Sequence, residues 1–137
     1  MDFFELKPLK VNGKYGWVDE NNNFVIQPLY DSPCARCYNG IVILQKDGWE
    51  GGIFLDSGRI AFQFIHRQLG WMYKETFQSI NSDGTATIIK PGDRQLSSHK
   101  YSIFYFNNNE RYIHYVRRNF WGNEIRGVLD LETGEEQ

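Results

Sequence analysis

Short apolar runs separated by polar turn residues recur along the chain, and their spacing predicts β-hairpins. Asn12-Gly13 lies between the runs PLKV and KYGWV, and Asp47-Gly48 lies between IVILQK and WEGGIFL. Asn-Gly and Asp-Gly are strong hairpin signals because a type I′ turn needs positive φ at both central positions. Pro91-Gly92, after TATIIK, predicts a type II turn. The asparagines at 107–109, between YSIFYF and RYIHYV, indicate a fourth hairpin.

The first hairpin and the residues that follow it recur further along the chain. A shift of 36 places Gly16 on Gly52 and continues without a gap for sixteen positions, with the apolar positions in register. The segment 127–130, GVLD, then repeats the pattern GWVD of residues 16–19. Self-similarity with a period near 36 residues indicates a repeat architecture rather than a catalytic motif.

These residues resemble the WG (or KWG) repeat, a bacterial β-rich repeat family. Its unit reads approximately Gly-Lys-aromatic-Gly-aromatic-Ile-Asp, a turn Gly, an apolar run with Pro and Tyr-Asp, and a Gly-Leu-Ala-x-Val strand. The first unit here has Gly13-Lys14-Tyr15-Gly16-Trp17-Val18-Asp19, Pro28, Tyr30-Asp31 and Gly40-Ile41-Val42-Ile43. The second keeps Gly52, Ile53 and Gly58, and the third keeps the GVLD segment and Gly134. The resemblance is best over roughly residues 10–60, and its motifs are structural.

Composition supports an all-β fold. Aromatic residues, which favour strands, make up 16% of the chain, and 13 glycines with four prolines supply frequent turn positions. We expect a single all-β domain of antiparallel hairpins over residues 1–137, built from about two and a half WG-like units at approximately 9–44, 45–90 and 91–137. Gly16 and Gly52 are expected at a bulge or at the close approach of a neighbouring aromatic residue. The run Phe3–Leu6 is expected to pair with the last strand and cover its edge.

Charge and hydropathy argue against nucleic acid and membranes as partners. The net charge of −2 offers nothing that recruits nucleic acid or an anionic membrane to the whole chain. No segment approaches the length of about 18 apolar residues that a spanning helix needs, and the N-terminal sequence lacks the features of a secretory signal. A cytoplasmic protein without a membrane partner is therefore expected.

Cys34 and Cys37 form the spacing CARC, which occurs in redox dithiols and in half of a zinc site. No second cysteine pair exists, and His66, His99 and His114 lack ligand spacing. The segment also lies between two β-like runs, whereas a thioredoxin-like motif lies between a strand and a helix. These features favour two thiols in a turn, and no metal or cofactor is predicted.

Catalytic signatures are absent from the sequence. Walker A, the dinucleotide glycine-rich loop, Gly-x-Ser-x-Gly and His-Glu-x-x-His do not occur. Asp19 and Asp31 could form a carboxylate pair, but each stands beside a turn, where Asp binds backbone N–H groups. We therefore predict no catalytic residue and no enzyme, while a site assembled from scattered residues stays open.

The fourth hairpin shows no polar face. A turn at 107–110 would pair Tyr105 with Tyr112, which puts two aromatic faces back to back. Either the hairpin is covered on both sides, or one face is left for a partner. The face rich in tyrosine suits an interface, and its candidate partner-binding residues are Tyr101, Tyr105, Tyr112 and His114.

Two further segments are candidates for binding. About eight extra residues fall within HRQLGWMYKETFQS, where Trp71 and Tyr73 form either an exposed partner-binding anchor or a lid over the core. Four arginines, interleaved with aromatic residues, could clamp single-stranded nucleic acid; they are Arg111, Arg117, Arg118 and Arg126. Nearby glutamates offset this charge, so solvated arginines are favoured over a nucleic-acid site.

The sequence thus predicts a non-enzymatic protein-interaction module, of the inhibitor or immunity type found in bacteria, that binds another protein. A small-ligand or nucleotide-binding β domain is the alternative, followed by an enzyme with an unrecognised site. An exposed flat aromatic patch favours the first function. A concave pocket of about 300 Å3 or more with converging polar groups favours the second.

Overall fold

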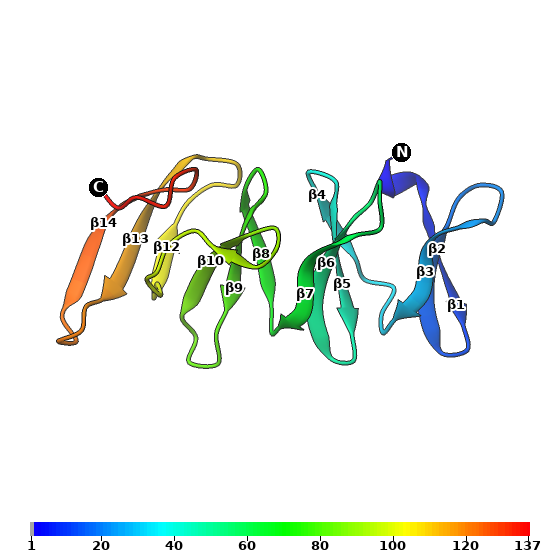
Figure 1. Cartoon of the computed structure of the whole chain (residues 1–137), viewed down its shortest axis with the longest axis horizontal. Helices are drawn as coiled ribbons and strands as arrows, with labels where there is room; N and C mark the ends of the chain where they lie inside the picture. The colour runs from blue at the N-terminus through cyan, green and yellow to red at the C-terminus, as the bar shows by residue number, and fades with distance from the viewer. Residues whose placement is uncertain (1) are drawn as a thin grey trace. The chain divides into compact units, whose positions relative to one another are not determined.

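The computed structural model describes residues 2–137, and its regular secondary structure is almost entirely β-strand (Figure 1). Consecutive strands form four antiparallel sheets of three, four, four and three strands, which confirms the predicted all-β class of antiparallel hairpins. Contacts divide the chain into two compact units, unit 1 up to Ile65 and unit 2 from His66. The expected number and bounds of the repeat units stay predictions.

The first sheet of unit 1 has the strand order β1-β2-β3, with β1 (Lys7–Val11), β2 (Lys14–Val18) and β3 (Phe24–Tyr30). Asn12 and Gly13 join β1 to β2 with φ of 51° and 83°, as the predicted type I′ turn requires. The helical turn η1 (Phe3–Glu5) precedes β1, and the Asp2 side chain caps it by accepting a hydrogen bond from the Phe4 N–H.

The second sheet follows the order β4-β5-β6-β7, with β4 (Arg36–Tyr38), β5 (Ile41–Lys46), β6 (Trp49–Phe54) and β7 (Ile60–His66). Asp47 and Gly48 form its tight turn, again with positive φ at both positions. One core cluster of unit 1 combines both sheets with the residues around η1; its buried members include Phe3, Leu6, Trp17, Ile26, Tyr30, Val42, Leu44 and Ile53.

The structure corrects the internal alignment of the repeat. Gly16 pairs with Leu9 in the first sheet, and Gly51, not Gly52, pairs with the corresponding Leu44 in the second. A Cβ atom on Gly16 would lie 2.5 Å from the Ile26 carbonyl oxygen, and a Cβ on Gly51 would lie 2.8 Å from backbone of β7 in the same way. The first and second sheets therefore correspond with an offset of 35 residues up to the end of β2 and β6, and of 36 residues from β3 and β7 onward. The offset changes because the turn after β6 is one residue longer than the turn after β2.

The third sheet belongs to unit 2 and has the order β11-β10-β9-β8, with β8 (Leu69–Tyr73), β9 (Thr76–Ile80), β10 (Ala86–Lys90) and β11 (Arg94–Gln95). The predicted insertion is not a loop, since its central residues form β8, the edge strand of this sheet. Gly92 has positive φ as predicted, and Asp93 after it also has positive φ.

The fourth sheet follows the order β12-β13-β14, with β12 (Ile103–Tyr105), β13 (Tyr112–Arg118) and β14 (Glu124–Asp130). The predicted register is wrong by two residues: Tyr105 pairs with His114 rather than Tyr112, because the connection between the strands is longer than the expected four-residue turn. A shift of two leaves every side chain on its predicted face, since successive residues of a strand alternate between faces.

The end of the chain covers the outer edge of β14. Val128 exchanges backbone hydrogen bonds with Gln137, and Leu129 forms an isolated bridge with Glu136. The expected pairing of Phe3–Leu6 with this strand is therefore wrong: Phe3 starts η1, and both Phe3 and Leu6 are buried in the core of unit 1.

One core cluster of unit 2 joins residues of its two sheets; its buried members include Met72, Ile88, Tyr101, Ile113, Tyr115, Leu129 and Leu131. Among the residues that the structure describes, no helix has the length and apolar character that crossing a membrane requires.

Candidate functional site

The two faces of the fourth sheet differ sharply in exposure. Ile113 and Tyr115 point into the core of unit 2, whereas Tyr112 and His114, which alternate with them along β13, are exposed. Tyr105 on β12 is 56% exposed and Tyr112 is 48% exposed. The hairpin is thus covered on one side only. We call this side the outer face; it comprises Ile103, Tyr105, Tyr112, His114, Val116, Arg126 and Val128, of which Val116 is buried.

A shallow, open depression lies in the middle of the outer face, where the pairing of the strands brings Tyr105, His114 and Val128 into one row. Its volume is about 460 Å3. It is lined by Tyr105, His114, Tyr115, Val116, Arg126, Gly127 and Val128. The structure therefore brings together two of the predicted partner-binding residues, Tyr105 and His114, with Arg126 beside them.

Tyr112 lies at the end of the outer face, and Arg111 holds its ring. The Arg111 guanidinium is 5.1 Å from the centre of the Tyr112 ring. It also donates two hydrogen bonds of 2.9 Å to the buried carboxylate of Asp130. These bonds hold the pKa of the Asp130 carboxyl well below its usual range. The Asp130 carboxylate thus fixes the guanidinium that lies over the Tyr112 ring.

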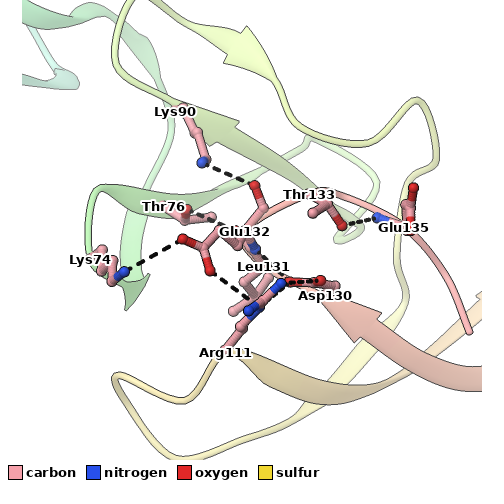
Figure 2. Close-up of polar contacts among 9 residues, drawn as sticks. All are labelled: Lys74, Thr76, Lys90, Arg111, Asp130, Leu131, Glu132, Thr133 and Glu135. Atoms are coloured by element: carbon pink, nitrogen blue, oxygen red, sulfur yellow. Dashed lines mark hydrogen bonds and ion pairs between the residues drawn. The ribbon is translucent and has the colours of Figure 1, made fainter.

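Figure 2 shows how the same arginine joins a wider polar cluster at the turn after β14. Arg111 also approaches Glu132 within 3.2 Å, and Lys74 approaches Glu132 within 3.5 Å. Thr76 donates to the Leu131 carbonyl at 3.2 Å, which ties this turn to β9. The cluster anchors the turn within unit 2.

Tyr101 does not belong to the outer face, which corrects its place among the predicted partner-binding residues. Its side chain is fully buried, and its hydroxyl lies 2.8 Å from the Ser97 hydroxyl and 3.0 Å from the Glu136 carboxylate. Burial raises the pKa of this phenol. The physical reason is a non-local bridge: Tyr101 pairs with Ala86 of β10, ahead of the first residue of β12.

Trp71 and Tyr73 lie on β8, in the third sheet, and do not line the depression. Both are half-buried. The Trp71 indole N–H donates to the Lys74 carbonyl at 2.8 Å, and Tyr73 packs against the core of unit 2. Tyr73 therefore covers part of the core, whereas the Trp71 indole is tied to the turn after β8.

Three of the four singled-out arginines are paired with carboxylates. Arg117 donates two hydrogen bonds to Glu136, at 2.7 and 2.8 Å, and Arg126 donates to Glu124 at 2.8 Å. Arg111 pairs with Asp130, as described above. Paired arginines have fewer free donors for phosphate groups, on which the affinity for nucleic acid depends.

One polar constellation was not predicted from the sequence. His66 Nδ1 lies 2.7 Å from Ser79 Oγ, and His66 Nε2 lies 2.8 Å from Asp93 Oδ1. Many hydrolases use the same three residue types, but there the histidine Nε2 faces the serine and Nδ1 faces the aspartate. The two ring nitrogens of His66 have the opposite partners. Ser79 is only 8% exposed and His66 only 9%, so a substrate carbonyl could not reach the hydroxyl without opening the sheet. The three side chains come from β7, β9 and the turn after β10, and no sequence spacing signals their proximity.

The two cysteines are free thiols in the structure. Cys34 is exposed in the segment before β4, whereas Cys37 is half-buried on β4, where burial raises the pKa of its thiol. Within residues 2–137, no group of three or more His, Cys, Asp or Glu side chains is placed to hold a metal ion.

The outer face is therefore the strongest candidate for a functional surface, because it joins exposed aromatic side chains to a depression with polar side chains at its rim. Its residues lie on paired strands, so their positions are defined by the sheet. Comparison with models of known protein families gives no match for this chain, and comparison with curated protein sequences gives none either.

Proposed function

We propose that the chain is a non-enzymatic module that binds another protein through the outer face. The observation that carries this proposal is the exposure of Tyr105 and Tyr112 on ordered strands beside an open depression. Tyrosine has an apolar body and a polar tip, and it is enriched where proteins bind one another.

The narrower part of the proposal is an inhibitor or immunity-type protein of bacterial origin that acts in the cytoplasm. It rests on the resemblance to WG repeats, best over residues 10–60, and on the lack of a catalytic motif in the sequence. Since a fold supports many functions, this part is an analogy and depends on the identity of the partner.

Affinity capture from cell extract tests the outer face. The wild type is compared with Tyr105→Thr/Tyr112→Thr, because threonine keeps the preference for strands while removing the rings. A partner retained by the wild type is expected to bind the double variant about tenfold more weakly or worse, since aromatic anchors dominate interface energies.

Trp49→Ala is the matched control, because Trp49 is an equally exposed aromatic residue of unit 1 outside the outer face. It should retain the same partner as the wild type. If the tyrosine variant, folded by circular dichroism, captures the same proteins with the same affinity, the outer face is not the binding surface.

Binding of a small ligand or nucleotide is the second candidate. The depression of about 460 Å3 falls within the range of ligand pockets. Tyr105, His114 and Arg126 bring polar groups to it. A thermal-shift screen with nucleotides favours this function if a ligand stabilises the wild type but not Arg126→Ala.

The non-enzymatic part of the proposal is tested at Ser79. A fluorophosphonate, which labels activated serines, is expected to leave the folded protein unlabelled because Ser79 is buried. Ser79→Ala should instead lower the free energy of unfolding by about 1 kcal/mol through the lost hydrogen bond to His66. Labelling that disappears in both Ser79→Ala and His66→Gln would contradict the proposal and indicate a hydrolase.

A further inference from the structure

Two turns of the chain share one hydrogen-bond pattern. The Asp19 side chain accepts hydrogen bonds from the N–H groups two and four residues further along, at 2.9 Å each. The Asn119 side chain accepts from the same two positions of its own turn, at 3.0 and 2.9 Å. Asn22 and Gly122 have positive φ at the same position. The turn between β2 and β3 and the turn between β13 and β14 are therefore equivalent.

The two turns differ at their tips. The first carries Glu20-Asn21, whereas the second carries Phe120-Trp121. Phe120 is 92% exposed and Trp121 is 79% exposed, and their rings pack edge to face with centroids 5.2 Å apart. Because the first turn forms with polar residues at these positions, the turn geometry does not require aromatic ones. The two exposed aromatic rings are therefore not needed for folding of the turn, and exposed apolar surface of this kind is typical of an interaction site.

The aromatic tip also carries a positive charge. Arg118, the last residue of β13, donates a hydrogen bond of 2.9 Å to the Gly122 carbonyl in the turn. Among residues 2–137, Glu124 lies opposite Arg118, and Arg118 contributes, after Arg126, to lowering the pKa of that carboxyl. The direct ion pair of Glu124 is with Arg126, so the two arginines and one glutamate leave a net positive charge beside the tip. The surface that fits this tip is therefore a recess with negative charge at its rim.

Unit 1 contains such a recess. A pocket of about 420 Å3 is lined by Glu5, Leu6, Asp19, Glu20 and Asn21. Within residues 2–137, the carboxylates of Glu5 and Glu20 have neither an ion pair nor a hydrogen bond, and Leu6 adds an apolar wall. The pocket is large enough for an aromatic side chain and opposite in charge to the tip.

We propose that this chain self-associates, with the Phe120-Trp121 tip of one copy seated in the acidic pocket of a second copy. Arg118 then lies beside the carboxylates of Glu5 and Glu20 of that copy. Tip and pocket are different surfaces, so the contact is heterologous and builds either a closed ring or an open chain. The outer face takes no part, and binding of another protein there is a separate proposal.

Analytical ultracentrifugation tests the self-association. The average sedimentation coefficient of the wild type is expected to rise from low micromolar to millimolar concentration and to fall when salt is added. Phe120→Glu/Trp121→Asn copies the tip of the first turn, so the turn should form as before. We expect it to raise the dissociation constant about tenfold or more, while Tyr105→Thr/Tyr112→Thr leaves the constant unchanged.

A charge exchange tests the pocket. Arg118→Glu and Glu20→Arg should each weaken self-association, and a mixture of the two variants should associate again because the pair is restored with reversed signs. A wild type that stays monomeric at every concentration overturns the proposal. So does an unchanged constant in the tip variant, or a mixture that remains monomeric.

Discussion

Replacing Gly16 with alanine is expected to lower the free energy of unfolding by about 3 kcal/mol. A Cβ atom there would lie 2.5 Å from the Ile26 carbonyl oxygen, 2.8 Å from the Pro28 nitrogen and 2.9 Å from the Gln27 carbonyl carbon. All three are backbone atoms of β3, so they can move only if β2 and β3 separate. Urea unfolding followed by circular dichroism measures the loss.

The neighbouring glycines of β6 provide the control. A Cβ on Gly51 would meet the Phe62 carbonyl oxygen at 2.8 Å, so Gly51→Ala should be about as costly as Gly16→Ala. A Cβ on Gly52 would meet only side-chain atoms, at 3.1 Å or more. These atoms can shift slightly, so Gly52→Ala should be milder. The reverse order, with Gly51 tolerant and Gly52 sensitive, would contradict the structural equivalence of Gly16 and Gly51.

Asp130→Asn is expected to lower the free energy of unfolding by about 3 kcal/mol near neutral pH. The buried Asp130 carboxylate accepts two hydrogen bonds from Arg111 and one from the Glu132 N–H, each 2.9 Å long. Asparagine has the same shape, but its side chain is uncharged. Its NH2 group would also face Arg111 or the Glu132 N–H, and two donors cannot form a hydrogen bond with each other. Thermal and urea unfolding of the two proteins measure the difference.

The effect of Asp130 should depend on pH. Arg111 lowers the pKa of Asp130 in the folded protein below its unfolded value of about 3.8. A lowered folded pKa means that the contribution is complete above the unfolded pKa and is lost as the pH falls toward the folded pKa. The gap between the wild type and Asp130→Asn should therefore shrink as the pH falls below about 4.

Asp56→Asn is the control for the pH dependence, because Asp56 is exposed in the turn after β6. It should change stability little at any pH. A gap between the wild type and Asp130→Asn that stays constant between neutral and acidic pH would show that Asp130 acts through its shape and not its charge.

Part of the candidate site was predictable because it depends on alternation along a strand. Tyr105 and His114 were placed on one face although the predicted register was wrong by two residues, since a shift of two preserves the face. Tyr101 breaks the alternation: it lies before β12, bridges to Ala86 of another sheet, and packs its ring against the inward-facing Phe104 and Tyr115. No periodicity within 101–116 could reveal that contact.

Other features were beyond sequence reasoning because they join residues far apart in the chain. His66, Ser79 and Asp93 meet across two strands and a turn. The equivalence of Gly16 with Gly51 required knowing which turn holds the additional residue. The shared hydrogen-bond pattern of the Asp19 and Asn119 turns was also hidden, because their tip residues have nothing in common.

The sequence by itself determined the all-β class, the tight turns at Asn12-Gly13 and Asp47-Gly48, and the face shared by Tyr105, Tyr112 and His114. These properties depend on a residue and its immediate neighbours, through the positive φ that a turn demands and the alternation of side chains along a strand. Only the tertiary structure decided the register of β12 on β13 and which of the two aromatic faces is open. Both depend on how segments distant in sequence pack, and pairing and burial of that kind leave no local pattern.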